Sequence, residues 1–237
     1  MRKDRQKTKE LEEVRRRSEK LLKENERLRQ ELLTAKGEKK QKDTAAYNEN
    51  IKDLTAADWF EKGYSFHTSD SYNDAIDAYS KAIDLNPNYA EAYNTRGLVY
   101  YSLGNYSQAI KDYDKAIELD PKDAFAYCTR GLVYYSLGNY SQAIEDHDRA
   151  IALNPKYAMA YNNRGIAYAD LGNYSQAIQD YVRAIALNPK YAIAYYNRGI
   201  AYARLGNLGQ AIADMKIAAR LGCKDAQNFL RGEGISW

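Results

Sequence analysis

The sequence TRGLVYYSLGNYSQAI fills residues 95–110, and the same sixteen residues return unchanged at 129–144. The second copy begins 34 residues after the first. The four prolines of the chain keep the same step and stand at Pro87, Pro121, Pro155 and Pro189. A fixed period of this size predicts a solenoid, in which each repeat packs only on its neighbours.

Five repeat units are predicted, with the bounds 56–89, 90–123, 124–157, 158–191 and 192–225. In the second unit, apolar residues recur at helical spacing as far as Leu103, and Gly104 is expected to end that helix. Asn105 stands three residues before Gln108, which is the spacing of a capping box that opens a second helix. Each unit is therefore expected to hold two helices, which we call helix A and helix B.

An ordered set of residues recurs on the 34-residue frame: an aromatic residue, a glycine, a tyrosine, two alanines and a proline. In the second unit these are Tyr93, Gly97, Tyr100, Ala109, Ala116 and Pro121. This pattern resembles the tetratricopeptide repeat (TPR) family, and the resemblance covers residues 56–225. It implies an all-α, right-handed superhelical solenoid of five helix pairs, whose concave groove binds protein partners.

Residues 226–237 follow the last unit. A solenoid needs a terminal element that covers its last apolar face. Ala226, Phe229 and Leu230 stand at helical spacing, so we expect a capping helix and a short tail. The alternative is that this tail acts as a peptide ligand.

An arginine precedes the glycine of helix A in the second to fifth units, and an aspartate follows it 16 residues later. The pairs are Arg96 with Asp112, Arg130 with Asp146, Arg164 with Asp180, and Arg198 with Asp214. The first unit lacks both, because it has Lys62 and Ala78 at these positions. This joint occurrence predicts structural ion pairs. The alternative is that the four arginines read a ligand in the groove.

Helix A lines the groove in TPR proteins, so the resemblance implies a set of partner-binding residues. They are Phe60, Tyr64, Asn94, Leu98, Tyr101, Phe125, Cys128, Leu132, Tyr135, Asn162, Ile166, Tyr196 and Ile200. Such an apolar and aromatic lining suits an anchored peptide or helix. The alternative for each residue is that it only packs on neighbouring helices.

One ligand class of the family is argued against. Chaperone-binding members hold a terminal carboxylate with lysine, asparagine and arginine side chains. Here those positions are occupied by Phe60, Tyr64, Leu98, Phe125 and Thr129. A ligand of the two-carboxylate clamp is therefore not expected.

Enzymatic chemistry finds little support in the sequence. The chain has two histidines, His67 and His147, so they supply no HExxH motif or zinc cluster. Its two cysteines, Cys128 and Cys223, have no CxxC spacing, and no phosphate-binding glycine motif occurs. We expect a protein without catalytic residues, cofactor or metal.

The sequence also bears on the compartment. The charged start has no apolar stretch behind it, and no run approaches the roughly 18 apolar residues of a membrane span. We expect a cytoplasmic protein, provided that residue 1 is the true start.

Residues 1–36 form a basic arm with a heptad pattern, and 37–55 are expected to be a linker. The first 43 residues hold 16 Lys/Arg and 10 Asp/Glu. The predicted coiled-coil core is Leu11, Val14, Leu21, Asn25, Leu28 and Leu32. Asparagine at a core position favours a parallel dimer. The alternatives are a solvated helix, a disordered arm, or a nucleic-acid contact, which is disfavoured because no base-reading motif is present.

These observations favour a scaffold or adaptor that binds a peptide or helix and is dimerised by its arm. Two grooves in one dimer would allow avidity. One alternative is a monomeric assembly chaperone that acts on a single client. Another is a nucleic-acid-associated regulator that uses the basic arm.

Overall fold

The computed structural model describes residues 34, 36 and 54–237 of the 237-residue chain. The predicted coiled coil, with its parallel dimer and the core positions Leu11, Val14, Leu21, Asn25, Leu28 and Leu32, lies outside the described residues. Residues Thr55–Trp237 form one structural unit.

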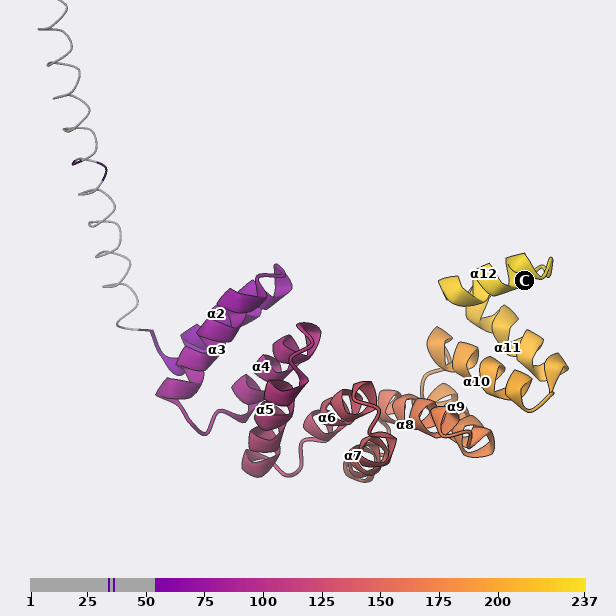
Figure 1. The fold of residues 1–237 in the computed structure, drawn as a ribbon, viewed down its shortest axis with the longest axis horizontal. Helices are drawn as coiled ribbons and strands as arrows, with labels where there is room; N and C mark the ends of the chain where they lie inside the picture. Colours follow the sequence, from indigo (N-terminus) through magenta and orange to yellow (C-terminus); the bar gives the residue numbers. More distant parts are fainter. Residues whose placement is uncertain (1–33, 35, 37–53) are drawn as a thin grey trace, which may run out of the picture. The chain divides into compact units, whose positions relative to one another are not determined.

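Helices follow one another along this unit, and residues 54–237 contain no strand (Figure 1). The five helix pairs are α2 (Ala56–Thr68) with α3 (Tyr72–Leu85), α4 (Ala90–Ser102) with α5 (Tyr106–Leu119), α6 (Ala124–Ser136) with α7 (Tyr140–Leu153), α8 (Ala158–Asp170) with α9 (Tyr174–Leu187), and α10 (Ala192–Arg204) with α11 (Leu208–Arg220). A shorter helix, α12 (Lys224–Gly232), follows them. The expected all-α solenoid of five helix pairs is confirmed.

A glycine turn separates the two helices of each pair from the second unit onward. Gly104 has φ of +73°, which an L side chain rarely adopts. Its backbone N–H donates to the carbonyl of Tyr101 at 2.9 Å, and the N–H of Asn105 donates to the carbonyl of Tyr100 at 2.8 Å. This is a Schellman motif, and it satisfies carbonyl groups at the end of helix A. The predicted stop at Gly104 is confirmed.

The helix N-termini differ from the expectation in one respect. Thr55 and Asp58 form a capping box, in which Asp58 N–H donates to Thr55 Oγ1 at 3.2 Å and Thr55 N–H donates to Asp58 Oδ2 at 2.9 Å. Asn105 makes no side-chain cap bond, so the capping box expected there is wrong. Asn105 follows the glycine turn directly, and that turn leaves it at φ −84° and ψ 66° rather than in extended backbone.

In the first, second and fourth units, a tyrosine ring of helix B packs against the glycine of helix A. A Cβ at Gly165 would lie 2.7 Å from Cε1 of Tyr181, and a Cβ at Gly97 would lie 3.1 Å from the ring of Tyr113. Because the glycines have no side chain, the two helices of a pair approach closely. His147 takes the tyrosine's position against Gly131 in the third unit.

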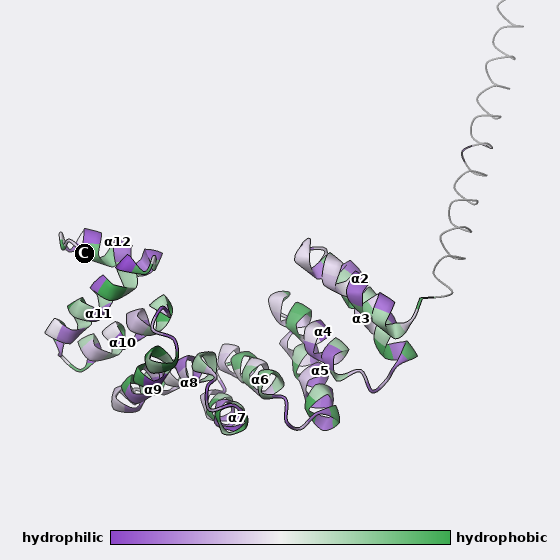
Figure 2. Cartoon of the chain, turned by 180° about the vertical axis from the view of Figure 1, so that it is seen from behind, coloured by the Kyte–Doolittle hydropathy of each residue, from purple (hydrophilic) through white to green (hydrophobic). Residues whose placement is uncertain are grey.

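Each helix pair packs on the next through an alanine-rich interface. In one such cluster, Ala177 and Tyr181 of α9 meet Ala201 of α10. Figure 2 shows that hydrophobic (green) and hydrophilic (purple) residues are interspersed along the helices. At the C-terminal end, Ala226 and Leu230 of α12 pack on Met215, Ala218 and Ala219 of α11. The helix expected after the last repeat therefore covers part of the final apolar face.

None of the helices in the described part of the chain has the length and apolar character that a membrane crossing requires.

Candidate protein-binding face

The A helices of successive units contact one another, α2 with α4, α4 with α6, α6 with α8, and α8 with α10. One position of the 34-residue frame places an apolar side chain on each of them: Tyr64, Leu98, Leu132, Ile166 and Ile200. These side chains are exposed or half-buried. We call this row, with its half-buried or exposed neighbours Tyr101, Phe125, Tyr135 and Tyr196, the helix-A face.

Exposure divides the predicted partner-binding residues into two groups. Tyr64 is 54% exposed, Phe125 is 41% exposed, and Ile200 is 37% exposed. A ligand can reach these side chains directly. Leu98, Tyr101, Leu132, Tyr135, Ile166 and Tyr196 are half-buried and still open toward solvent.

The second group is buried: Phe60, Asn94, Cys128 and Asn162. The ring of Phe60 packs against Tyr89 with a centroid distance of 5.1 Å. Cys128 is 0% exposed and packs with Ala150 and Ala160. These residues therefore pack between neighbouring helices, which is the alternative considered above for each predicted groove residue.

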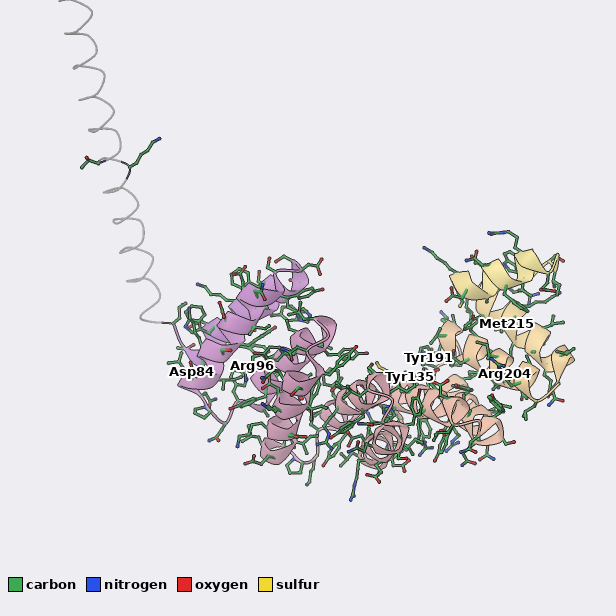
Figure 3. All side chains as sticks on the ribbon, in the orientation of Figure 1. Asp84, Arg96, Tyr135, Tyr191, Arg204 and Met215 are labelled. Carbon is green, nitrogen blue, oxygen red and sulfur yellow. The ribbon has the colours of Figure 1, made fainter. Side chains whose placement is uncertain are left out.

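Hydrogen bonds join the A helices along this face. The Tyr135 hydroxyl donates to Asp170 Oδ2 at 2.5 Å, and Tyr101 and Ser136 join their hydroxyls at 3.2 Å. Asn197 Nδ2 donates to Asn162 Oδ1 at 3.1 Å. Burial, followed by the bond to Asp170, raises the pKa of Tyr135, so the phenol stays protonated. Figure 3 labels Tyr135 among the side chains of the repeats.

Sequence reasoning missed the polar partners Asp123, Asn163 and Asp170. Asn94 Nδ2 donates to Asp123 Oδ2 at 2.5 Å, and Asn163 Nδ2 approaches Cys128 Sγ at 3.8 Å. The tyrosine pairs join residues 35 apart, as do Asn162 and Asn197. A comparison of polar residues at one repeat length plus one would have found these pairs.

The arginines of helix A bind the aspartates of helix B. Arg96 donates from Nε and Nη2 to the two carboxylate oxygens of Asp112, both at 2.8 Å (Arg96 is labelled in Figure 3). Arg130 and Asp146 repeat this two-bond geometry at 2.8 and 2.6 Å. The same pairing joins Arg164 to Asp180 and Arg198 to Asp214.

Each of the first three arginines also donates from Nη1 to helix B of the preceding unit. Arg96 reaches Ser80 at 2.8 Å, Arg130 reaches Asp114 at 2.6 Å, and Arg164 reaches Asp148 at 2.5 Å. We call the four arginines, the aspartates paired with them, and the second acceptors Ser80, Asp114 and Asp148 the arginine ladder. The second acceptor was not predicted, although a second aspartate two residues after the first is visible in residues 112–114 and 146–148.

The arginine–aspartate pairs within each unit lie mostly below the surface, whereas Asp114 and Asp148 are about half exposed. The four paired aspartates are only 4–5% exposed. Burial acts to lower the pKa of Arg130, but the hydrogen bonds and charges of Asp146 and Asp114 outweigh it and raise the pKa. The cation is therefore compensated within the fold.

The two cysteines provide a test of this burial. Burial raises the pKa of the Cys128 thiol to about 11, and the thiolate is the reactive form. We expect a disulfide reagent at pH 8 to modify the half-buried Cys223 in the native protein, and Cys128 only after unfolding. Mass spectrometry of the labelled peptides measures this. Equal labelling of the two thiols in the native protein would contradict the burial of Cys128.

Residues 54–237 offer no group of three or more His, Cys, Asp or Glu side chains that can hold a metal ion. What the site presents is a row of apolar and aromatic side chains on rigid helices. A stack of helix pairs with such a surface defines a repeat solenoid of the protein-interaction class.

The comparison with protein families identifies this solenoid. The TPR repeat model matches residues 63–104, 97–138, 131–172 and 167–206, and the tetratricopeptide repeat model matches 192–221. The chain belongs to the tetratricopeptide repeat family, whose members bind protein partners. No curated protein sequence gives a significant match.

Several solved structures share the fold. The sequence in the crystal structure of MamA is 32% identical to this chain, and the two structures superpose with a TM-score of 0.62. The alignment covers 70% of this chain and 96% of the MamA chain. YrrB, described as a TPR protein with an unusual peptide-binding site, is 24% identical, with a TM-score of 0.60 and coverages of 81% and 97%. PilF of Pseudomonas aeruginosa is 18% identical, with a TM-score of 0.66 and coverages of 70% and 76%.

Proposed function

We propose that the protein is a non-enzymatic scaffold that binds a peptide or helix of a protein partner on its helix-A face. The observation that carries this proposal is the row of open apolar side chains at one frame position of all five A helices. An extended or helical ligand that lies along the A helices meets Tyr64, Leu98, Leu132, Ile166 and Ile200 in turn. Rigid apolar side chains give contact area at a small entropic cost.

The face is also held in shape before any ligand arrives. Tyr135 is fixed by Asp170, and Tyr101 is fixed by Ser136 and by the ring of Tyr106 at 5.8 Å. A preorganised surface loses less entropy on binding than a mobile one. YrrB, which shares the fold, is described as having a peptide-binding site. Both points support a peptide or helix as the ligand.

The test uses a random peptide library displayed on phage and selected on the full chain. We expect the double variant Leu132→Asp/Ile166→Asp to bind the enriched peptide at least about tenfold more weakly, because it places two charges in an apolar contact. Fluorescence polarisation of the labelled peptide measures the affinity.

The matched control is Leu153→Asp/Leu187→Asp, which changes two exposed leucines at the ends of α7 and α9. This control should bind the peptide like the unaltered chain. Equal losses in the two double variants, or a loss in the control alone, would refute the assignment of the helix-A face.

We also propose that the arm of residues 1–36 joins two such scaffolds in a parallel dimer. Its basis is the heptad pattern with Asn25 at a core position. Sedimentation of the full chain beside residues 44–237 tests it. If both samples sediment as monomers, the proposed dimer does not form and the scaffold has a single binding face.

A further inference from the structure

The arginine ladder is interrupted at its last step. Arg198 is held by Asp214 at 2.7 and 2.8 Å, as its predecessors are held by their own aspartates. The residue at the frame position of Asp114 and Asp148, however, is Val182. No described residue accepts a hydrogen bond from Arg198 Nη1, and Val182 is 41% exposed.

The Arg198 guanidinium is nevertheless fixed in the same orientation as the others. Asp214 holds its Nε and Nη2 atoms, and the rings of Tyr195 and Tyr202 lie 5.5 and 5.9 Å from its central carbon. In the third unit, the corresponding Nη1 atom meets a carboxylate oxygen of Asp114 at 2.6 Å. The repeat itself therefore shows what fits beside Nη1: a carboxylate that approaches over helix B of the preceding unit.

The surroundings of Arg198 also differ in charge from those of the third unit. A cavity of about 510 Å³ beside Arg130 is lined in part by Glu145, Asp146, Asp148 and Arg149. The fifth-unit residues at the frame positions of Glu145, Asp146, Asp148, Arg149 and Ala152 are Ala213, Asp214, Lys216, Ile217 and Arg220. A surface that is acidic in the third unit has thus become basic in the fifth.

Apart from Arg198, the cations of this region have no acidic partner among the residues that the structure describes. None of the carboxylates that the structure describes lies within ion-pair distance of Lys216 or Arg220. The two nearby buried aspartates, Asp180 and Asp214, are already bound to Arg164 and Arg198. We call Val182, Arg198, Lys216 and Arg220 the basic edge.

We propose that the basic edge is a second docking site, separate from the helix-A face, for an acidic segment of a protein partner. One carboxylate of this segment accepts a hydrogen bond from Arg198 Nη1, in the place that Asp114 and Asp148 occupy for the preceding arginines. Its neighbouring acidic side chains meet Lys216 and Arg220. A free arginine donor with flanking cations attracts an acidic peptide by charge complementarity.

The test uses the full chain and a fluorescein-labelled octaglutamate peptide, with polarisation measured at low and at physiological salt. Val182→Asp supplies the missing carboxylate from within the chain. This variant should fold, because α5 and α7 already carry aspartate at this position. It should bind the peptide about fivefold more weakly than the unaltered protein, since Arg198 Nη1 is then occupied.

Gln142→Glu is the matched control, because it adds the same charge at an exposed position of α7 that is not part of the basic edge. It should change the affinity less than about twofold. Equal effects of the two substitutions would overturn the site, since only diffuse attraction would remain. A single-stranded oligothymidylate that binds more tightly than the peptide, with the same sensitivity to Val182→Asp, would overturn the acidic-peptide assignment in favour of a nucleic acid.

Discussion

Replacing Arg130 by leucine is expected to lower the free energy of unfolding by about 3–5 kcal/mol. The substitution leaves the Asp146 carboxylate, which is 5% exposed, without the two hydrogen bonds of 2.8 and 2.6 Å that compensate its charge. It also removes the bond to Asp114, which joins the third unit to the second. Denaturant unfolding followed by circular dichroism measures the change.

The double variant Arg130→Leu/Asp146→Asn is the matched control. It removes the buried anion together with its cation, so we expect it to recover at least half of the lost stability. Peptide binding on the helix-A face should persist in both variants at temperatures where they are folded. An Arg130→Leu variant that unfolds like the unaltered chain but loses the peptide would show that the arginine contacts the ligand.

Replacing His147 by tyrosine is expected to remove a pH dependence of stability worth about 3 kcal/mol. His147 is 0% exposed, and neither of its ring nitrogens has a hydrogen-bond partner among the described residues. Burial, assisted by the charge of Arg164, lowers the pKa of His147 to about 4. Protonation of this ring in the folded protein is therefore costly.

The direction of the effect follows from the folded pKa lying below the usual value of 6.5. Above about pH 6.5 the ring is neutral in both the folded and the unfolded chain. The part of the unfolding free energy that depends on a neutral His147 is then fully present. Between about pH 6.5 and 4 the unfolded chain binds a proton that the folded chain does not, so stability is lost as the pH falls. As the pH falls through this window, the unfolding free energy of the unaltered chain should therefore drop increasingly below that of His147→Tyr.

Tyr113→His provides the reciprocal variant, because Tyr113 is fully buried against Gly97 as His147 is against Gly131. It should acquire the same loss of stability on acidification. Parallel pH profiles for His147→Tyr and the unaltered chain would mean that this ring does not control the acid sensitivity.

The repeat made most of the fold predictable from the sequence. Gly104 ends its helix where expected, because a positive φ angle follows from local chemistry. The pairing of Arg130 with Asp146 could be predicted from the sequence, because the units that have this arginine also have this aspartate and the first unit lacks both. The second acceptor, Asp114, belongs to the preceding unit, and a reading of one unit at a time does not show it.

Burial along helix A was less predictable than the helices themselves. Phe125 is 41% exposed, while Cys128, three residues later on the same helix, is fully buried. Both occupy positions that the family resemblance assigns to the groove. The difference depends on how closely α8 approaches α6, as in the contact of Cys128 with Ala160, and this distance is a property of tertiary packing.

Methyl NMR of the full chain with the phage-selected peptide tests whether a partner binds along the helix-A face. We expect the methyl signals of Leu98, Leu132, Ile166 and Ile200 to shift together on binding. The exposed methyl groups of Leu153 and Leu187, at the ends of α7 and α9, should remain unchanged. Shifts confined to Leu153 and Leu187, with the four helix-A signals unchanged, would show that the peptide binds away from the helix-A face.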